Sequence, residues 1–321
     1  MTTRTRYFVI TSLLVLAVGL GTGLVAFYVG LPVVGGGSSN PSELDYVPRT
    51  AAVVAYAEVR EIMVSDVRQR IRRVVPIPED GQRAFKEQTG IDIESDIDHV
   101  VASLEPQADG KTAGLVLARG RFNEATIETL MRQHGAEVEE YQGKRVMIRT
   151  SPSGTAGETF ALSFIEPGLI AIGNPPMVRT AIDLQKTGEN VRMNSELMGL
   201  LGSIDAGQAW VVGRVDALQS GRSLPAGIAE RLPAITWFSV SGQVDSQVSG
   251  TVRADTRDEQ AANDLRDVVR GFLALAKLQA GSRPEMQAMV QSLELGGTGN
   301  SVALSFSIPG EVFDTLPSRQ Q

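Results

Sequence analysis

The chain has 321 residues, of which 42% are hydrophobic and 21% are charged, and it contains no cysteine. This composition is typical of a folded protein and excludes a disordered or collagen-like chain. The net charge is −7, the wrong sign for a surface that binds nucleic-acid phosphates, so we expect no nucleic-acid partner. The absence of cysteine excludes disulfides, thiol nucleophiles and zinc sites with cysteine ligands.

The first feature along the chain is a long uncharged run, Tyr7–Leu31. A helix of its 25 residues would be about 37 Å long, more than the roughly 30 Å hydrocarbon core of a bilayer requires. Arg4 and Arg6 precede it, and a positive flank stays in the cytoplasm. We therefore predict a cytoplasmic tail at residues 1–6, a single transmembrane helix at residues 7–31, and an extracytoplasmic C-terminal part. A cleaved signal peptide is the alternative, although its apolar region is usually only about 7 to 15 residues long.

Small residues recur within this run and directly after it. Gly19 and Gly23 form a G-x-x-x-G pattern, which lets two membrane helices approach closely. A homodimer through the anchor helix is one interpretation, and a lone anchor is the other. Residues 32–47 are rich in Gly, Ser and Pro, which predicts a flexible linker. The predicted location is the outer face of the cytoplasmic membrane, with the folded part close to the bilayer.

The rest of the chain shows two similar sets of patterns, at residues 48–190 and 205–317. The clearest sign is a repeated phrase, because Phe160–Gly168 reads FALSFIEPG and Val302–Gly310 reads VALSFSIPG. In both, apolar residues alternate with small or polar ones, as in a strand with one buried face, and Pro-Gly ends the run. We interpret the two sets as an internal repeat.

The two sets also share an order of elements. In the first we expect a strand at Val53–Val59, a helix marked by Val67, Ile71 and Val74, a hairpin of Val100–Leu104 with Ala113–Arg119, a helix from Asn123 to Gly135, and the Phe160 strand. In the second we expect a strand at Trp210–Val215, a short helix at Ile228–Leu232, a hairpin of Trp237–Ser241 with Val248–Ala254, a long helix, and the Val302 strand. The long helix should start at a Thr256–Glu259 capping box, and its apolar face contains Ala261, Leu265, Val268, Phe272 and Leu275. Each set reads β-α-β-β-α-β, the split βαβ order of ferredoxin-like folds. The predicted fold class is α+β, an N-terminal transmembrane helix followed by two tandem ferredoxin-like repeats.

One stretch of the first repeat also carries a resemblance. Phe85-Lys-Glu-Gln-Thr-Gly-Ile-Asp, followed by Asp96-Ile-Asp-His-Val, resembles a family of exported, membrane-anchored bacterial domains of unknown function. The resemblance covers roughly residues 48–320. It implies an exported location and a fold of this kind, and it implies no activity.

Few side chains suited to catalysis occur. The histidines are His99, beside Asp98 at a strand entrance, and His134, which we place in the last turn of a helix, where a cation is favoured. No G-x-S-x-G or S-x-x-K motif is present. Gly296–Asn300 is glycine-rich, but a strand follows it in place of the Lys-Ser/Thr of a P-loop, so we predict a hairpin turn. We expect no enzyme and assign no catalytic, cofactor-binding or metal-binding residue.

Four carboxylates lie close together in the sequence. Asp92, Glu94, Asp96 and Asp98 alternate with isoleucines around a short stretch. Such oxygen ligands suit a hard cation such as Ca²⁺, but the spacing lacks the glycine and the distal glutamate of an EF-hand loop. A solvated edge or loop with inward isoleucines is the simpler interpretation.

Arginine and tryptophan side chains give two further candidates. Four arginines crowd the first predicted helix, where they would either contact anionic lipid headgroups or form an ordinary solvated face. The tryptophans would either bind a sugar or peptide or pack in the core, and we favour the core. These residues are Arg68, Arg70, Arg72 and Arg73, and Trp210 and Trp237.

These patterns favour a binding function over a catalytic one. The sequence predicts a membrane-anchored, envelope-facing binding or scaffold protein with an unknown envelope protein partner. The alternative is a periplasmic hydrolase or metal-dependent enzyme whose site the motifs do not reveal.

Overall fold

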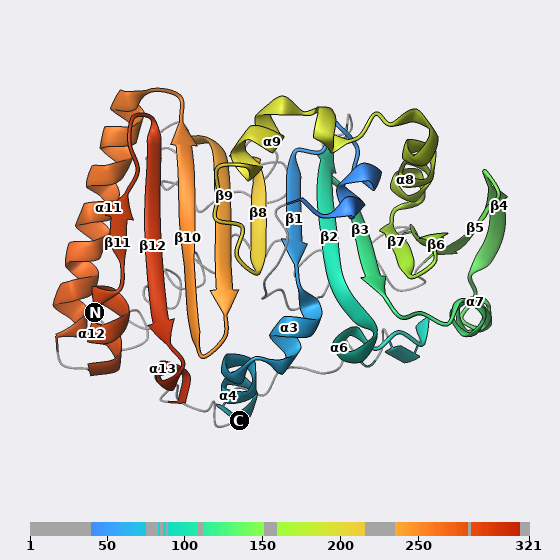
Figure 1. The fold of residues 1–321 in the computed structure, drawn as a ribbon, viewed down its shortest axis with the longest axis horizontal. Coiled ribbons are helices and arrows are strands. Elements are labelled where there is room, and N and C mark those ends of the chain that lie inside the picture. Colours follow the sequence, from blue (N-terminus) through green and yellow to red (C-terminus); the bar gives the residue numbers. More distant parts are fainter. Residues whose placement is uncertain are drawn as a thin grey trace.

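One antiparallel sheet of twelve strands runs through the molecule in the order β11-β12-β10-β9-β8-β1-β2-β3-β7-β6-β5-β4 (Figure 1). The computed structural model describes residues 40–74, 83, 86–87, 89–107, 112–150, 159–215, 235–281 and 284–314. The strands are β1 (Val53–Ala57), β2 (Ile97–Pro106), β3 (Thr112–Gly120), β4 (Glu137–Tyr141), β5 (Lys144–Thr150), β6 (Thr159–Glu166), β7 (Leu169–Gly173), β8 (Ala209–Arg214), β9 (Ile235–Val244), β10 (Gln247–Thr256), β11 (Glu294–Gly296) and β12 (Ser301–Pro309).

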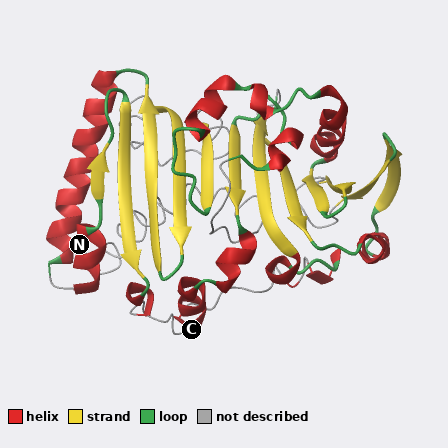
Figure 2. Cartoon of the chain, viewed as in Figure 1, coloured by secondary structure: helices red, strands yellow, loops and turns green. Residues whose placement is uncertain are grey.

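The helices surround this sheet, and one of them follows its edge. Figure 2 shows the strands as a single layer with helices around the rim. The 3₁₀ helices are η1 (Ser42–Tyr46) and η2 (Val191–Met193), and the α-helices are α3 (Val59–Val64), α4 (Asp66–Val74), α6 (Ile93–Asp96), α7 (Glu124–Gln133), α8 (Pro175–Thr187), α9 (Ser195–Leu201), α11 (Glu259–Ala280), α12 (Pro284–Gln291) and α13 (Glu311–Asp314).

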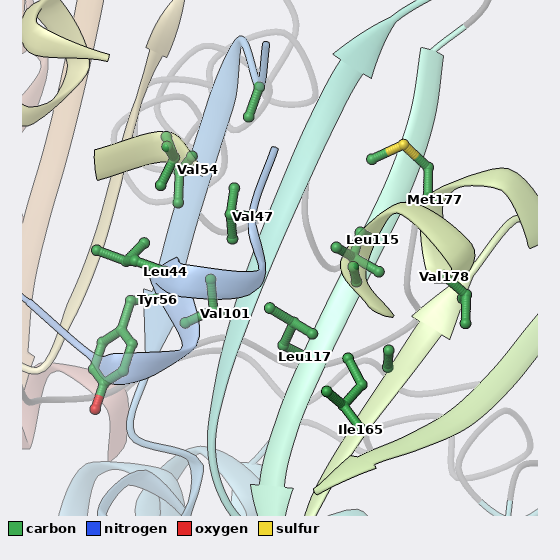
Figure 3. Close-up of a cluster of buried hydrophobic side chains, with 14 of the residues drawn as sticks. Leu44, Val47, Val54, Tyr56, Val101, Leu115, Leu117, Ile165, Met177 and Val178 are labelled. Atoms are coloured by element: carbon green, nitrogen blue, oxygen red, sulfur yellow. The ribbon is translucent and has the colours of Figure 1, made fainter. Parts of the chain in front are cut away.

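Apolar layers pack on both sides of the central strands. On one side, η1, α8, η2 and α9 cover a core that includes Leu44, Val54, Leu117 and Val178 (Figure 3). On the other side, α3, α6 and α7 cover a second core. β1 reads VVAYA and buries all five of its residues, as expected for a strand with both faces covered.

The two predicted repeats meet in the middle of this sheet. β1 pairs antiparallel with β8, and Ala55 lies opposite Val211. On one side of this pair the chain continues as β1-β2-β3, and on the other as β8-β9-β10. The central six strands therefore have an approximate two-fold arrangement about the Ala55–Val211 pair.

Several predicted elements are confirmed. The two predicted hairpins are β2–β3 and β9–β10, and the helix predicted from Asn123 to Gly135 is α7. The Asn123 side chain caps α7 by accepting a hydrogen bond from the Thr126 N–H. The predicted short helix Ile228–Leu232 lies outside the described residues.

The predicted tandem ferredoxin-like fold is wrong. In a split βαβ unit, the strand after the helix runs parallel to the first strand and leaves room for another strand between them. Here the segment holding α3, α4 and α6 returns the chain to the neighbouring position, and β2 pairs directly and antiparallel with β1. Residues 48–190 and 205–317 also share one sheet, because β1 and β8 are hydrogen-bonded neighbours.

The repeated ALSF phrase does not mark equivalent strands. Leu162 lies in β6, the fifth strand of its half when β1 is counted as the first, whereas Leu304 lies in β12, the fourth strand of its half when β8 is counted as the first. By position in the sheet, the counterpart of Leu304 is Ile172 of β7, since each lies opposite the third strand of its half. The phrase records a shared strand pattern, and its use as a structural match was wrong.

The predicted membrane anchor also requires correction. Tyr7–Leu31 and the tail before it lie outside the described residues, as do Gly19 and Gly23. Within the described ranges no helix is long and apolar enough to cross a membrane, since even the 22 residues of α11 include charged side chains along their length. The structure therefore does not support the single-pass anchor or the membrane location deduced from it. Residues 42–46 of the predicted linker form η1, which packs on the sheet.

Candidate functional site

The four candidate carboxylates are each held by different partners. Asp92 caps α6 by accepting a hydrogen bond from the Glu94 N–H at 3.0 Å, and it also accepts one from Lys86 Nζ at 2.6 Å. The hydrogen bond from Lys86 lowers the pKa of Asp92 below its usual range. Asp96 accepts a hydrogen bond from the Asp92 N–H at 2.8 Å. These contacts define a capped loop.

The remaining two carboxylates pair with arginines of the preceding helices. Glu94 binds Arg68 of α4, and Asp98 binds Arg60 of α3. The carboxylates therefore do not converge on one point, and no group of three or more His, Cys, Asp or Glu in the described part of the chain could hold a metal ion. The cation interpretation of this cluster is not supported.

The arginine candidates are divided in the same way. Arg68 is 8% exposed and turns toward Glu94, so it joins α4 to α6 and does not face outward. Arg70 lies beside Gly310, at the end of β12. The side chains of Arg72 and Arg73 lie outside the described residues.

Other single-residue predictions are confirmed. His134 lies at the C-terminal cap of α7, and its Nδ1 is 2.8 Å from the Leu130 carbonyl oxygen. Trp210 is 2% exposed and stacks on Tyr56, with 5.7 Å between ring centroids. Trp237 is partly buried against the same core. Gly296–Asn300 connects β11 to β12 as a hairpin turn.

A buried charge network lies beneath η1, and no sequence pattern indicated it. Glu43 points into the sheet and is 1% exposed. Its Oε1 accepts a hydrogen bond from Arg119 Nε of β3 at 2.7 Å, and its Oε2 lies 3.3 Å from His99 Nε2 of β2. Arg119 also donates to Glu166, at the end of β6, at 2.6 Å. We call Glu43, His99, Arg119 and Glu166 the η1 network.

The η1 network keeps Glu43 ionised. Burial raises the pKa of Glu43, but the neighbouring His99 ring and the hydrogen bond from Arg119 outweigh this effect and lower the pKa from 4.5 to about 2. Glu43 Oε1 accepts the hydrogen bond from Arg119, and Glu43 Oε2 faces the His99 ring nitrogen. A general base needs a pKa near the working pH and a free oxygen, so the arrangement suits the anchoring of η1 better than proton transfer.

A second contact holds η1 from its outer side. Arg192 of η2 forms an ion pair with Asp45, bonds to the Asn40 side chain, and donates to the Pro41 carbonyl oxygen at 2.8 Å. The contacts of Arg192 and of Glu43 together hold the start of the described chain against η2 on one side and against β2 and β3 on the other. η2 lies about 150 residues further along the sequence. The role of this cluster is to position a segment.

The other conspicuous feature is α11, the longest described helix. Asp258 caps it by accepting a hydrogen bond from the Ala261 N–H at 2.8 Å, so the predicted Thr256–Glu259 capping box is wrong. Thr256 instead ends β10 and donates to the Asn300 carbonyl oxygen at 2.9 Å.

The sheet covers only some of the apolar side chains of α11. Ala262 and Leu265 pack against Val302 of β12 on the sheet side that also carries α3 and α7. Three large apolar side chains of the predicted face are exposed, and so is a fourth, Leu278, which follows them on the same helix. These four, which we call the α11 strip, are Val268 at 39% exposed, Phe272 at 51%, Leu275 at 45% and Leu278 at 81%.

Comparison with known protein families, with curated proteins and with solved structures finds no match for this chain. The resemblance to exported bacterial domains therefore stays a prediction. The function has to be inferred from the surfaces of the molecule itself.

Proposed function

We propose that this protein acts by binding, and that the α11 strip is the surface on which another polypeptide docks. The observation that carries the proposal is the concentration of exposed apolar side chains on one helix. Six large apolar residues are exposed in the described part of the chain, and four of them belong to the strip; the other two are Val64 and Met193. A contiguous exposed apolar patch is the usual mark of an interaction surface.

The spacing of the strip suits helical recognition. Its members follow one another at intervals of four, three and three residues, so at about 100° per residue they gather on one side of the helix. Full burial of a Leu or Phe side chain stabilises a complex by about 1.5 to 3 kcal/mol. Three or four such side chains are enough to support a specific contact, with polar neighbours at the rim.

The strip is mounted on a rigid support, which favours a binding role. Leu265 is 7% exposed against the sheet, and Arg266 donates to the carbonyl oxygens of Gly299 and Ser301, both at 2.8 Å. These bonds join α11 to the β11–β12 turn. A surface that is already ordered loses little conformational entropy when a partner binds.

The enzyme alternative has less support from the contacts. Its candidate carboxylates, between Asp92 and Asp98, are committed to lysine, arginine and backbone partners. The most buried carboxylate among the described residues, Glu43, is held by Arg119 and His99. These groups favour a structural role, so we develop the binding proposal alone.

Site-specific photo-crosslinking tests the proposal. A benzoylphenylalanine placed at Phe272 of the full chain should give an adduct of defined mass in extracts of the native cells. The matched control is the same group at Asn263, which is exposed on the polar side of α11. We expect the Phe272 adduct to be lost when Leu275→Asp is added, because a charge on the strip opposes burial. Equal adducts from both positions, or none from either, would overturn the proposal.

A further inference from the structure

We infer that the polypeptide seated on the α11 strip is a second copy of this chain, with the two α11 helices packed antiparallel about a two-fold axis. This inference rests on the proposed function, since it names the partner of the same surface. The homodimer predicted through Gly19 and Gly23 concerns a different segment, which lies outside the described residues.

The exposed side of α11 has the spacing of a helix-pairing seam. Val268, Gly271, Leu275 and Leu278 are all exposed and follow one another at intervals of three, four and three residues. This is the alternation of the a and d positions in a coiled coil. The seam that attaches α11 to its own sheet is a different one, centred on Leu265. The helix thus carries one occupied seam and one open seam.

The open seam is complementary to itself when one copy is reversed. Its members are symmetric about Leu273, so antiparallel pairing places Val268 opposite the partner's Leu278 and Gly271 opposite the partner's Leu275. Nothing lies within 4 Å of the position that a Cβ would take on Gly271. Gly271 therefore leaves a hole in the middle of the seam, and the Leu275 side chain has the bulk to fill it, as a knob fills a hole.

Charge also selects the antiparallel orientation. The acidic residues of α11 are Glu259, Asp264 and Asp267, all in its first half together with Arg266, whereas the second half carries Arg270 and Lys277 and no acid. Parallel pairing would place acid beside acid. Antiparallel pairing about Leu273 keeps the acidic residues of the two copies apart and opposes the two helix dipoles, which is the favourable arrangement.

Between Val268 and Leu278, the strip contains no charge that two copies would have to bury. Arg270 and Lys277 lie well away from the strip at 100° per residue, and Arg270 pairs with Asp267 at 2.7 Å. This matters because each chain carries −7 overall, and the copies can approach only where the contact is apolar.

Because α11 lies at one edge of the sheet, two copies can meet through it as a closed, two-fold dimer. Figure 1 shows α11 along one edge of the sheet, beside β11 and at the opposite end from β4. A two-fold contact uses the same patch on both copies, so it stops at a dimer and does not grow into a fibre.

The cysteine-free sequence makes a direct test possible. Val268, Gly271, Leu275 and Leu278 are each replaced by Cys in the full chain, with Asn263→Cys and Arg270→Cys as controls on the polar side. Differently tagged variants are mixed and oxidised gently. We expect Gly271→Cys to form a mixed disulfide with Leu275→Cys faster than either variant forms a disulfide with itself, since only the mixed pair shares a layer. The controls should stay unlinked.

Sedimentation equilibrium of the purified wild-type chain provides an independent readout. We expect a species of twice 34.3 kDa that dissociates in Leu275→Asp and in Leu278→Asp. Both residues are exposed, so circular dichroism should match the wild type. A wild-type monomer at all concentrations, or disulfides with no preference among the six positions, would overturn the inference. If the Phe272 photo-adduct then contains a different polypeptide, the proposed function stands without the dimer; if no adduct forms, both fail.

Discussion

At the scale of single residues, Glu43 shows how a distant pair of partners fixes a segment. A carboxylate under a sheet-covering helix is stable only when it is paired, because burial of an isolated charge is costly. Its partners His99 and Arg119 lie 56 and 76 positions further along the chain. Local pattern reasoning could place His134 at a helix end and Trp210 in a core, but it had no access to a contact of this kind.

Removal of the Glu43 charge should weaken the whole fold. We predict that Glu43→Gln lowers the free energy of unfolding by about 3 kcal/mol, because Arg119 loses its buried counter-charge and keeps only the partly exposed Glu166. Urea denaturation followed by circular dichroism measures the change. The control is Glu137→Gln on the exposed start of β4, which we expect to change stability by less than about 0.5 kcal/mol. Equal values for the two variants would contradict the role of the η1 network.

The same group predicts a pH dependence. The pKa of Glu43 is lowered in the folded chain, from 4.5 to about 2, so its contribution is fully present above pH 4.5 and is lost as the pH falls toward 2. Over that window we expect the wild type to lose up to about 3 kcal/mol more than Glu43→Gln does. Urea midpoints for both proteins at a series of pH values test this. Parallel pH profiles would show that Glu43 does not titrate as proposed.

At the scale of elements, α11 shows what periodicity predicts and what it leaves open. The apolar spacing correctly predicted a helix after β10, and Leu265 lies on its buried side as expected. The same pattern put Val268, Phe272 and Leu275 on the apolar face with Leu265, but the structure leaves these three side chains exposed. A helix pattern reports the width of the apolar arc, whereas the width that is covered depends on the sheet and loops that pack against it.

Substitutions at two leucines of α11 should distinguish the side that packs on the sheet from the exposed side. Leu265→Ala should destabilise the chain by about 2 to 5 kcal/mol, because it removes a buried side chain from the contact with Val302. Leu275→Ala should cost about 0.5 kcal/mol or less in the dissociated chain, since that side chain is 45% exposed. Urea unfolding at low protein concentration compares them. A large loss for Leu275→Ala would mean that the strip belongs to the internal core.

At the scale of the whole molecule, the sequence indicated the content of each half but not the connection between them. Both three-strand units were predicted as a strand followed by a hairpin. Their union through Ala55 and Val211 could not be predicted, because strand patterns report which residues are buried and do not report the neighbouring strand. The ferredoxin-like interpretation failed at this step. A β-α-β order is compatible with an antiparallel neighbour when the intervening helices return the chain to the same edge of the strand.

The shared sheet predicts cooperative unfolding. Because β1 and β8 bury each other, neither half can open without exposing the apolar centre of the other. We expect the urea transition reported by tryptophan fluorescence, which includes the central Trp210, to coincide with the far-UV circular dichroism transition. Two separated transitions would indicate independent halves, as expected for tandem domains.

If one side of α11 is a docking surface, a position-by-position crosslinking scan along the helix should show which side a partner covers. Benzoylphenylalanine is placed in turn at Asn263, Val268, Arg270, Phe272, Leu275, Lys277 and Leu278 of the full chain, and the adduct yield is measured at each position. We expect high yields at Val268, Phe272, Leu275 and Leu278 and low yields at Asn263, Arg270 and Lys277, in step with the turn of the helix. A flat profile, or one that peaks on the polar side, would contradict this expectation.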